Sequence, residues 1–158
     1  PFSKIGKEWM LITAGNTNKI NTMTASWGSL GVMWGKNVAF TFIRPQRYTK
    51  TFVDSEDYFS LCFFDEFYKK TLSYLGSTSG KNEDKISKSE LTPYFIDNVP
   101  CFEEANLILI CKKLYVQELK HDCFLDLNLD TKWYELKDYH SMYVSEIEKI
   151  YEKNYTSI

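Results

Sequence analysis

Residues 21–51, NTMTASWGSLGVMWGKNVAFTFIRPQRYTKT, decide how this chain folds and what it can hold. A stretch rich in Gly, Ser and Thr, Asn21–Gly28, comes first. In Val38–Arg44, aromatic and β-branched residues then follow the two-residue period of a strand. The next residues, Arg44–Thr49, read RPQRYT, which is cationic and carries hydroxyl groups. The segment predicts a strand that ends in a turn suited to an anion.

Similar runs elsewhere predict a mainly β protein. Strands are expected at Glu8–Ala14, Lys19–Ala25, Tyr58–Phe64, Ala105–Glu118 and Cys123–Leu127. Helices are expected from about Gln46 to Asp54, and from a cap at Asp65 to Leu75, with Gly76 as the left-handed residue after the second helix. Many strands with few, short helices predict a β-barrel with appended helices.

One segment allows two interpretations. In Met142–Glu152, Tyr143, Ile147, Ile150 and Tyr151 recur at helical spacing, which favours an amphipathic helix. The family resemblance described below favours a strand instead, and tertiary pairing often overrides a weak helical period.

Composition limits the class of protein. The chain has 158 residues, enough for one domain spanning residues 1–158, and a net charge of -2 with both signs mixed, which argues against nucleic acid as a partner. No apolar stretch approaches the ~20 residues of a membrane span, and no signal-peptide pattern is visible. Four widely spaced cysteines without a CxxC motif predict reduced, mostly buried thiols in a cytoplasmic protein.

Two parts of the opening segment are candidate binding elements. Arg44, Arg47 and Thr49 could surround a phosphate at the start of a short helix, or the arginines could simply be solvated in a turn. Small residues such as Thr24 and Ser26 would let the backbone approach a flat ligand, with Trp27 and Trp34 as walls. The alternative is an ordinary loop with tryptophans in the core.

Other chemistry has less support. His121-Asp122-Cys123 lacks further ligands at metal spacing, so no metal site is predicted. There is no nucleophile elbow, P-loop or GxGxxG motif, and no catalytic residue is predicted. His140, in DYHSMY, is a candidate general acid or ring contact, or else a surface histidine.

Several segments together resemble the flavin reductase-like family of FMN-binding split barrels, and its flavoredoxin-like subgroup in particular. They are NTMTASWGSLG, the W-x-K of residues 34–36, IRPQRYT and FSLCFF. SGKNEDK is similar to the subgroup's SGRDxDK loop, with Lys81 in place of Arg. YHSMYVSEI is similar to H-x-[ML]-[FY]-[IV]-G-E-[IV], with Ser145 in place of Gly. The resemblance runs from about Trp9 to Tyr151.

The resemblance implies a six-stranded Greek-key split barrel that forms a homodimer, with FMN at or near the interface. It implies that Arg47, Tyr48 and Thr49 surround the phosphate, and that Ser79 and Lys85 close over the flavin or meet the partner subunit. His140 would lie near the site. The isoalloxazine would be lined by Thr22, Met23, Thr24, Ala25, Ser26 and Trp27.

The function that follows is an FMN-binding oxidoreductase, in which electrons pass from NADH or NADPH through flavin to an acceptor. Such a protein has to hold the ring and expose one face, and it needs no catalytic base. Two alternatives stay open: an FMN electron carrier that never meets NAD(P)H, and a split barrel that has lost flavin and binds another ligand. A nucleic-acid-binding barrel is a more distant fourth, given the charge balance.

Overall fold

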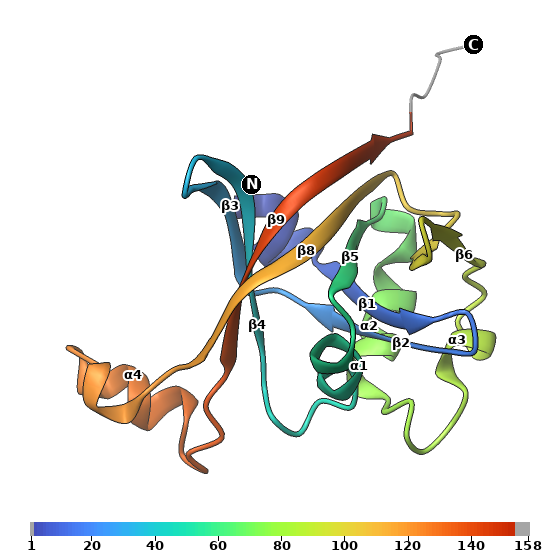
Figure 1. Ribbon diagram of the computed structural model, residues 1–158. Helices are drawn as coiled ribbons and strands as arrows, with labels where there is room; N and C mark the ends of the chain where they lie inside the picture. Colours follow the sequence, from blue (N-terminus) through green and yellow to red (C-terminus); the bar gives the residue numbers. More distant parts are fainter. Residues whose placement is uncertain (1, 154–158) are drawn as a thin grey trace.

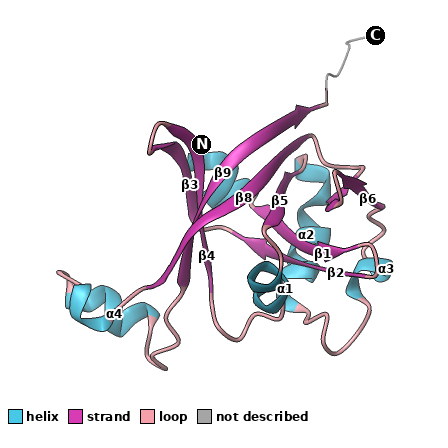
Figure 2. Ribbon diagram, viewed as in Figure 1, coloured by secondary structure: helices cyan, strands magenta, loops and turns pink. Residues whose placement is uncertain are grey.

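The computed structural model describes residues 2–153, which form a curled antiparallel sheet with short helices around it (Figures 1 and 2). The sheet has seven strands in the order β2-β1-β5-β8-β9-β4-β3. Their bounds are β1 (Met10–Asn16), β2 (Lys19–Ala25), β3 (Gly28–Met33), β4 (Lys36–Ile43), β5 (Tyr58–Phe63), β8 (Leu107–Glu118) and β9 (Ser141–Glu152). A separate hairpin pairs β6 (Pro93–Ile96) with β7 (Val99–Phe102).

The connection between β2 and β3 shows why the sheet must curl. These strands form its opposite edges, yet only Ser26 and Trp27 separate Ala25 from Gly28. Six strand spacings of a flat sheet would cover ~29 Å. Three residue steps reach at most ~11 Å. The two edges therefore come together, as in a split barrel, and the predicted fold class is confirmed with seven strands in the sheet instead of six.

The buried side chains divide between the two faces of the sheet. Ile12, Phe59, Leu61 and Tyr143 belong to a cluster inside the barrel. Leu11 alternates with Ile12 and belongs to a second cluster, which packs against the helix α2 (Lys69–Ser77) and the β6–β7 hairpin. The barrel thus has one face filled internally and the other covered by α2.

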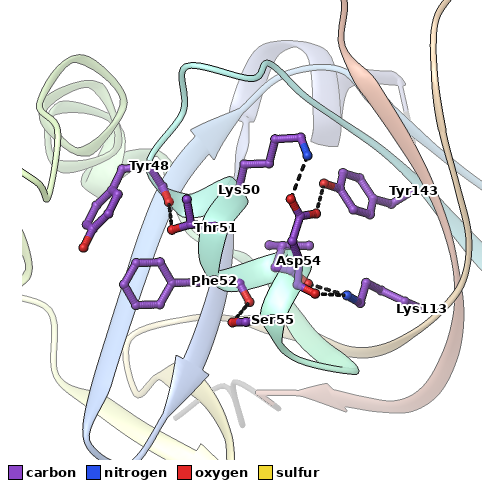
Figure 3. A network of polar contacts seen from close by, with 9 residues as sticks. Tyr48, Lys50, Thr51, Phe52, Asp54, Ser55, Lys113 and Tyr143 are labelled. Atoms are coloured by element: carbon purple, nitrogen blue, oxygen red, sulfur yellow. Dashed lines mark hydrogen bonds and ion pairs between the residues drawn. The ribbon is translucent and has the colours of Figure 1, made fainter.

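The helix α1 (Thr49–Ser55) is close to the expected Gln46–Asp54 and is fixed at several points (Figure 3). Lys113 Nζ donates to the carbonyls of Val53 (2.6 Å) and Asp54 (3.1 Å). Tyr143 OH donates to Asp54 Oδ1 (2.6 Å), and Lys50 pairs with Asp54 Oδ2 (2.7 Å). These contacts anchor α1 to β8 and β9 and so hold the turn before it in place.

Gly76 was expected to follow a helix but lies inside α2, which ends at Ser77, and its φ is not positive. A side chain at this position would have its Cβ 3.1 Å from Thr24 Cβ. The glycine therefore allows α2 to approach β2 closely and does not terminate the helix. The helix α3 (Lys85–Lys88) follows, capped by Asp84, whose carboxylate accepts from Ser87 N (3.1 Å).

Two further expectations about strands have a clear outcome, and one strand was not expected. Met142–Glu152 is the strand β9, because it pairs with β4 on one side and β8 on the other, so the helical pattern is misleading. Cys123–Leu127 was wrongly expected to be a strand. It runs from the last residue of a 3₁₀ turn, His121–Cys123, to the first residue of the helix α4 (Leu127–Trp133), which Asp126 caps. The strand β3 was not expected, since residues 29–33 are exposed and show no alternation of burial.

Cys62, Cys101 and Cys111 are buried and Cys123 is exposed, and all four thiols are free, as expected. Further short segments are a π-helical turn, Lys4–Glu8, and a 3₁₀ turn, Glu66–Tyr68, which begins the second expected helix. No helix in the described part of the chain is long and apolar enough to span a membrane.

Candidate functional site

Three cavities that share lining residues form a groove along the seam where the two edges of the sheet meet. The polar cavity, of about 190 Å³, lies between the end of the RPQRYT turn and the loop after α2. The central cavity, of about 210 Å³, shares Met23 and Arg47 with it. The apolar cavity, of about 590 Å³, shares Ser26, Trp27 and Phe42 with the central one. The groove is therefore polar at one end and apolar at the other.

Two cations face the polar cavity. Arg47 Nη1 donates to the Gly76 carbonyl (3.0 Å). Lys85 is buried, and its Nζ donates to the carbonyls of Leu75 (2.7 Å) and Thr78 (2.8 Å). Carbonyls at a helix C-terminus lack intrahelical donors, and here the two side chains supply them. Neither cation forms an ion pair within residues 2–153, so no carboxylate of this described part neutralises the positive charge at this end of the groove through direct contact.

Burial lowers the pKa of both cations at the polar cavity. Burial, and then the positive charge of Arg47, lowers the pKa of Lys85 to about 8. The pKa of Arg47 is also lowered by burial. A buried cation without a counterion is destabilised, and an anion in the cavity would relieve that cost.

Neutral groups complete the polar cavity. Asn21 Nδ2 donates to Thr49 Oγ1 (2.9 Å), which ties β2 to the start of α1. A side chain on Gly80 would place its Cβ 2.2 Å from Asn21 Oδ1, so the loop can lie against β2 only because this residue is glycine. Ser79 and Tyr48 also line this cavity.

Aromatic rings wall the central cavity. The rings of Trp27 and His140 are 4.8 Å apart and tilted by 34°, and Trp27 meets Trp133 edge to face at 5.1 Å. His140 is buried, with its Nδ1 2.7 Å from Tyr134 OH, so it is not the surface histidine of the alternative interpretation. Burial and the nearby charge of Arg44 lower the pKa of His140 to about 4, which keeps the ring neutral at pH 7.

The structure places most of the expected site residues on this groove. Those that line one of the three cavities are Met23, Thr24, Ala25, Ser26, Trp27, Arg44, Arg47, Tyr48, Thr49, Ser79, Lys85 and His140. Thr22 does not line it. Its Oγ1 is buried against Thr13 Oγ1 (2.8 Å) and the Ile12 carbonyl (3.2 Å).

Two expected roles change. Arg44 was grouped with the phosphate-binding turn, but it lies on the central cavity, where it contacts Asp138 Oδ2 (2.5 Å) and the Trp133 carbonyl (2.8 Å). Its charge is already matched by a carboxylate. Trp34 was expected to wall the ring, but it is exposed at the β3–β4 turn and packs edge to face on Tyr115.

Sequence reasoning missed several lining residues. Trp133 replaces Trp34 as the second tryptophan, and it comes from a segment without a motif, so no signal pointed to it. Others lie beside the quoted motifs and could have been included for that reason: Asn21, Phe42, Gln46, Gly76, Ser77, Thr78 and Gly80.

The sequence matches no family model and no curated protein. Solved structures do resemble the fold. Flavoredoxin from Methanosarcina acetivorans matches with a TM-score of 0.71 and 21% identity, over 96% of this chain and 71% of that one. An FMN-binding protein from Thermus thermophilus, with bound p-hydroxybenzaldehyde, matches with a TM-score of 0.72 and 20% identity, over 93% and 72%. A putative flavin reductase with a split barrel domain, from Shewanella frigidimarina, matches with a TM-score of 0.74 and 16% identity, over 94% and 68%.

This chain therefore has the split-barrel fold. These neighbours are proteins of the kind that the sequence motifs resemble, flavoredoxins and flavin reductases among them. At such identities the likeness concerns the fold, and the function has to be argued from the groove.

Proposed function

We propose that this chain binds FMN in the groove and acts as a flavin oxidoreductase, which passes electrons from NADH or NADPH to a further acceptor. The observation that carries the proposal is the pairing of Arg47 and Lys85, two cations without ion-pair partners in the described chain, with an adjoining aromatic cavity. A phosphate on a planar ring system needs both parts. The solved neighbours described as FMN-binding or flavoredoxin proteins add support.

The residues divide the work of binding. Arg47 can grip a phosphate through two N–H groups, and Lys85 adds a point charge. Trp27 and Phe42 supply flat apolar surface for a ring in the central cavity, where Ser26 offers a polar contact. When bound, FMN would supply the capacity to accept a hydride and release electrons singly or in pairs. The protein orients the ring and excludes water from one side.

The apolar cavity favours an enzyme over an electron carrier. It adjoins the central cavity through Ser26, Trp27 and Phe42, and its volume of about 590 Å³ suits a small organic molecule. A carrier that exchanges electrons only with proteins has no use for such a space beside the ring. The carrier is therefore the second candidate.

The homodimer is part of the same proposal. The edge strand β3 exposes apolar side chains, among them Leu30 and Val32, and β8 exposes Tyr115 and Val116. Apolar side chains on an open edge strand favour association with another chain. Val32→Asp should shift the molecular mass measured by light scattering from dimer to monomer, and a wild-type monomer would contradict the dimer.

Retention of flavin is the first test. The purified protein is mixed with FMN or with riboflavin, which lacks the phosphate, and desalted, and its absorbance is recorded between 300 and 550 nm. Retained FMN with little riboflavin supports the site. Anaerobic addition of NADH or NADPH then separates the candidates, because rapid bleaching indicates the enzyme and slow bleaching the carrier. Loss of all colour with both flavins would contradict prosthetic binding and leave a flavin-exchanging reductase or another ligand.

A further inference from the structure

Residues 119–140 form an arm that leaves the sheet after β8 and returns at β9, and α4 lies away from the barrel in Figure 1. Leu119 N donates to the His140 carbonyl (2.9 Å), which closes the base of the arm. Within the arm, the rings of Tyr134 and Tyr139 are 4.9 Å apart, and Phe124 packs on both. The arm therefore has its own aromatic cluster, and Tyr134 connects that cluster to His140.

The hydrogen bond between Tyr134 and His140 has a defined direction. Tyr134 OH lies 2.7 Å from His140 Nδ1, and Tyr134 is only 3% exposed. The His140 backbone N–H also bonds to this hydroxyl, but it is itself a donor, so within residues 2–153 His140 Nδ1 is the acceptor left for the phenol proton. If Nδ1 carried the proton, the phenol proton would have no acceptor in a buried place, which costs free energy. The phenol therefore donates, and Nδ1 accepts.

We propose that Tyr134 fixes His140 in the neutral tautomer that carries its proton on Nε2, so that His140 offers an N–H donor to the central cavity. The nitrogen that is protonated in a histidine is set by the bond that the other nitrogen makes. His140 lines the central cavity, and its Nε2 has no partner in the described chain. Tyr134 is thus a positioning residue, and His140 is the group that meets the ligand.

The surroundings hold both rings in place. Trp27 packs on His140, and the Arg44 guanidinium lies 5.3 Å from the centre of the Tyr134 ring. Arg44 is itself fixed by Asp138. Burial and the charge of Arg44 lower the pKa of His140, and the charge of Asp138 opposes them more weakly, so the donor stays neutral across the neutral pH range.

A donor of fixed identity selects the edge of a ligand. A carbonyl oxygen or an unprotonated ring nitrogen can accept from Nε2–H, whereas an N–H or amino group at that point leaves two donors facing each other. This step rests on the proposed function: His140 would contact a carbonyl or ring nitrogen of the flavin, or of the molecule that exchanges electrons with the flavin. Two donors in opposition would exclude the reverse orientation of the ligand.

The tautomer can be read without any ligand. The chain has two histidines, so long-range ¹H–¹⁵N correlation spectra of labelled protein contain two imidazoles, and His121→Gln assigns them. The expected result at pH 7 is a protonated Nε2 and an unprotonated Nδ1 for His140. A protonated Nδ1 in the wild-type protein would overturn the proposal.

Two variants separate positioning from a structural role. Tyr134→Phe removes the donor and should give His140 a mixture of tautomers. Tyr139→Phe removes a hydroxyl from the same aromatic cluster, where it donates to Asp130 (2.6 Å), and should leave the tautomer of His140 unchanged. If both variants change the tautomer equally, the effect is structural and the proposal fails. If Tyr134→Phe does not fold, the tautomer of His140 measured in the wild-type protein still tests the proposal.

The ligand gives an independent readout. Tyr134→Phe should lower the affinities for FMN and riboflavin alike, by about three- to tenfold, because His140 contacts the ring and not the phosphate. A loss confined to FMN would contradict the assignment. Should wild-type protein bind neither flavin, the proposed function fails, while the tautomer measurement still tests Tyr134.

Discussion

Arg47 and Lys85 donate to adjacent carbonyls at the end of α2, those of Gly76 (3.0 Å) and Leu75 (2.7 Å). The two side chains come from the turn before α1 and from the start of α3, and they meet only because both segments pack against α2. Each donates to main-chain carbonyls but has no negative partner in the described chain. This relationship makes the pH dependence of binding and stability a test of the site.

The affinity for FMN should fall above pH 8. Burial and the charge of Arg47 lower the pKa of Lys85 to about 8, and a bound phosphate would raise it again by favouring the charged form. Binding therefore takes up a proton near and above this pH. Titration calorimetry in two buffers of different ionisation enthalpy measures the uptake, and riboflavin should show none. An FMN affinity that is constant from pH 7 to pH 9.5 would contradict the placement of the phosphate beside Lys85.

The stability contributed by residue 85 should rise with pH. The folded-state pKa of Lys85 is below its ordinary value of 10.5, so between about pH 8 and 10.5 the unfolded chain binds more protons than the folded one. The cost of burying the charge is complete below pH 8 and is relieved as the pH rises through this window. The difference in unfolding free energy between wild type and Lys85→Met, from urea titrations, should move in favour of wild type between pH 7.5 and pH 10. A difference that stays constant would show that the pKa of Lys85 is not lowered in the folded protein.

Arg47→Ala should weaken the binding of FMN by about 2 kcal/mol, because charge-assisted hydrogen bonds to the phosphate are lost. Riboflavin binding should change much less. Lys81→Ala is the matched control, because Lys81 lies in the neighbouring loop, is exposed and lines none of the three cavities. Fluorescence titration gives all the affinities, and equal losses for Arg47→Ala and Lys81→Ala would leave only a general electrostatic effect.

Gly80→Ala should destabilise the fold by roughly 1–3 kcal/mol, because the new Cβ would lie 2.2 Å from Asn21 Oδ1. Asn21 is buried and bonded to Thr49, so it cannot move aside freely. Gly31→Ala, on the exposed strand β3, is the control, since nothing lies within 4 Å of its Cβ position. Urea unfolding compares the two, and similar stabilities would mean that the loop does not pack on β2 as described.

Trp27→Ala should raise the fluorescence of bound flavin, because an indole packed against the ring quenches its emission. Trp34→Ala tests the alternative wall and should have no effect, since Trp34 lies at the exposed β3–β4 turn. Emission measured at saturating FMN decides between them. Unchanged emission in Trp27→Ala, or a rise in Trp34→Ala, would contradict the placement of the flavin ring against Trp27.

Local sequence was informative where a residue's environment is set by its near neighbours. The period-two run in Val38–Arg44 gave β4, and the RPQRYT turn placed Arg47, Tyr48 and Thr49 on one cavity. It failed where distant pairing decides. Met142–Glu152 has helical spacing, but pairing with two flanking strands makes it a strand. Gly76 is required by the close approach of α2 to Thr24 on β2, and not by a helix end.

By itself, the sequence determined a mainly β chain and, through motifs of the split-barrel kind, most of the residues that line the groove. Only the tertiary structure decided that Arg44 pairs with Asp138, that Trp133 and not Trp34 faces Trp27, and that Tyr134 reaches His140. The physical reason is range. Strand periods and turns depend on interactions among neighbouring residues. The contacts of Arg44 with Asp138 and of Trp27 with Trp133 form only when the arm packs back on the barrel, and that of Tyr134 with His140 only when the arm itself folds.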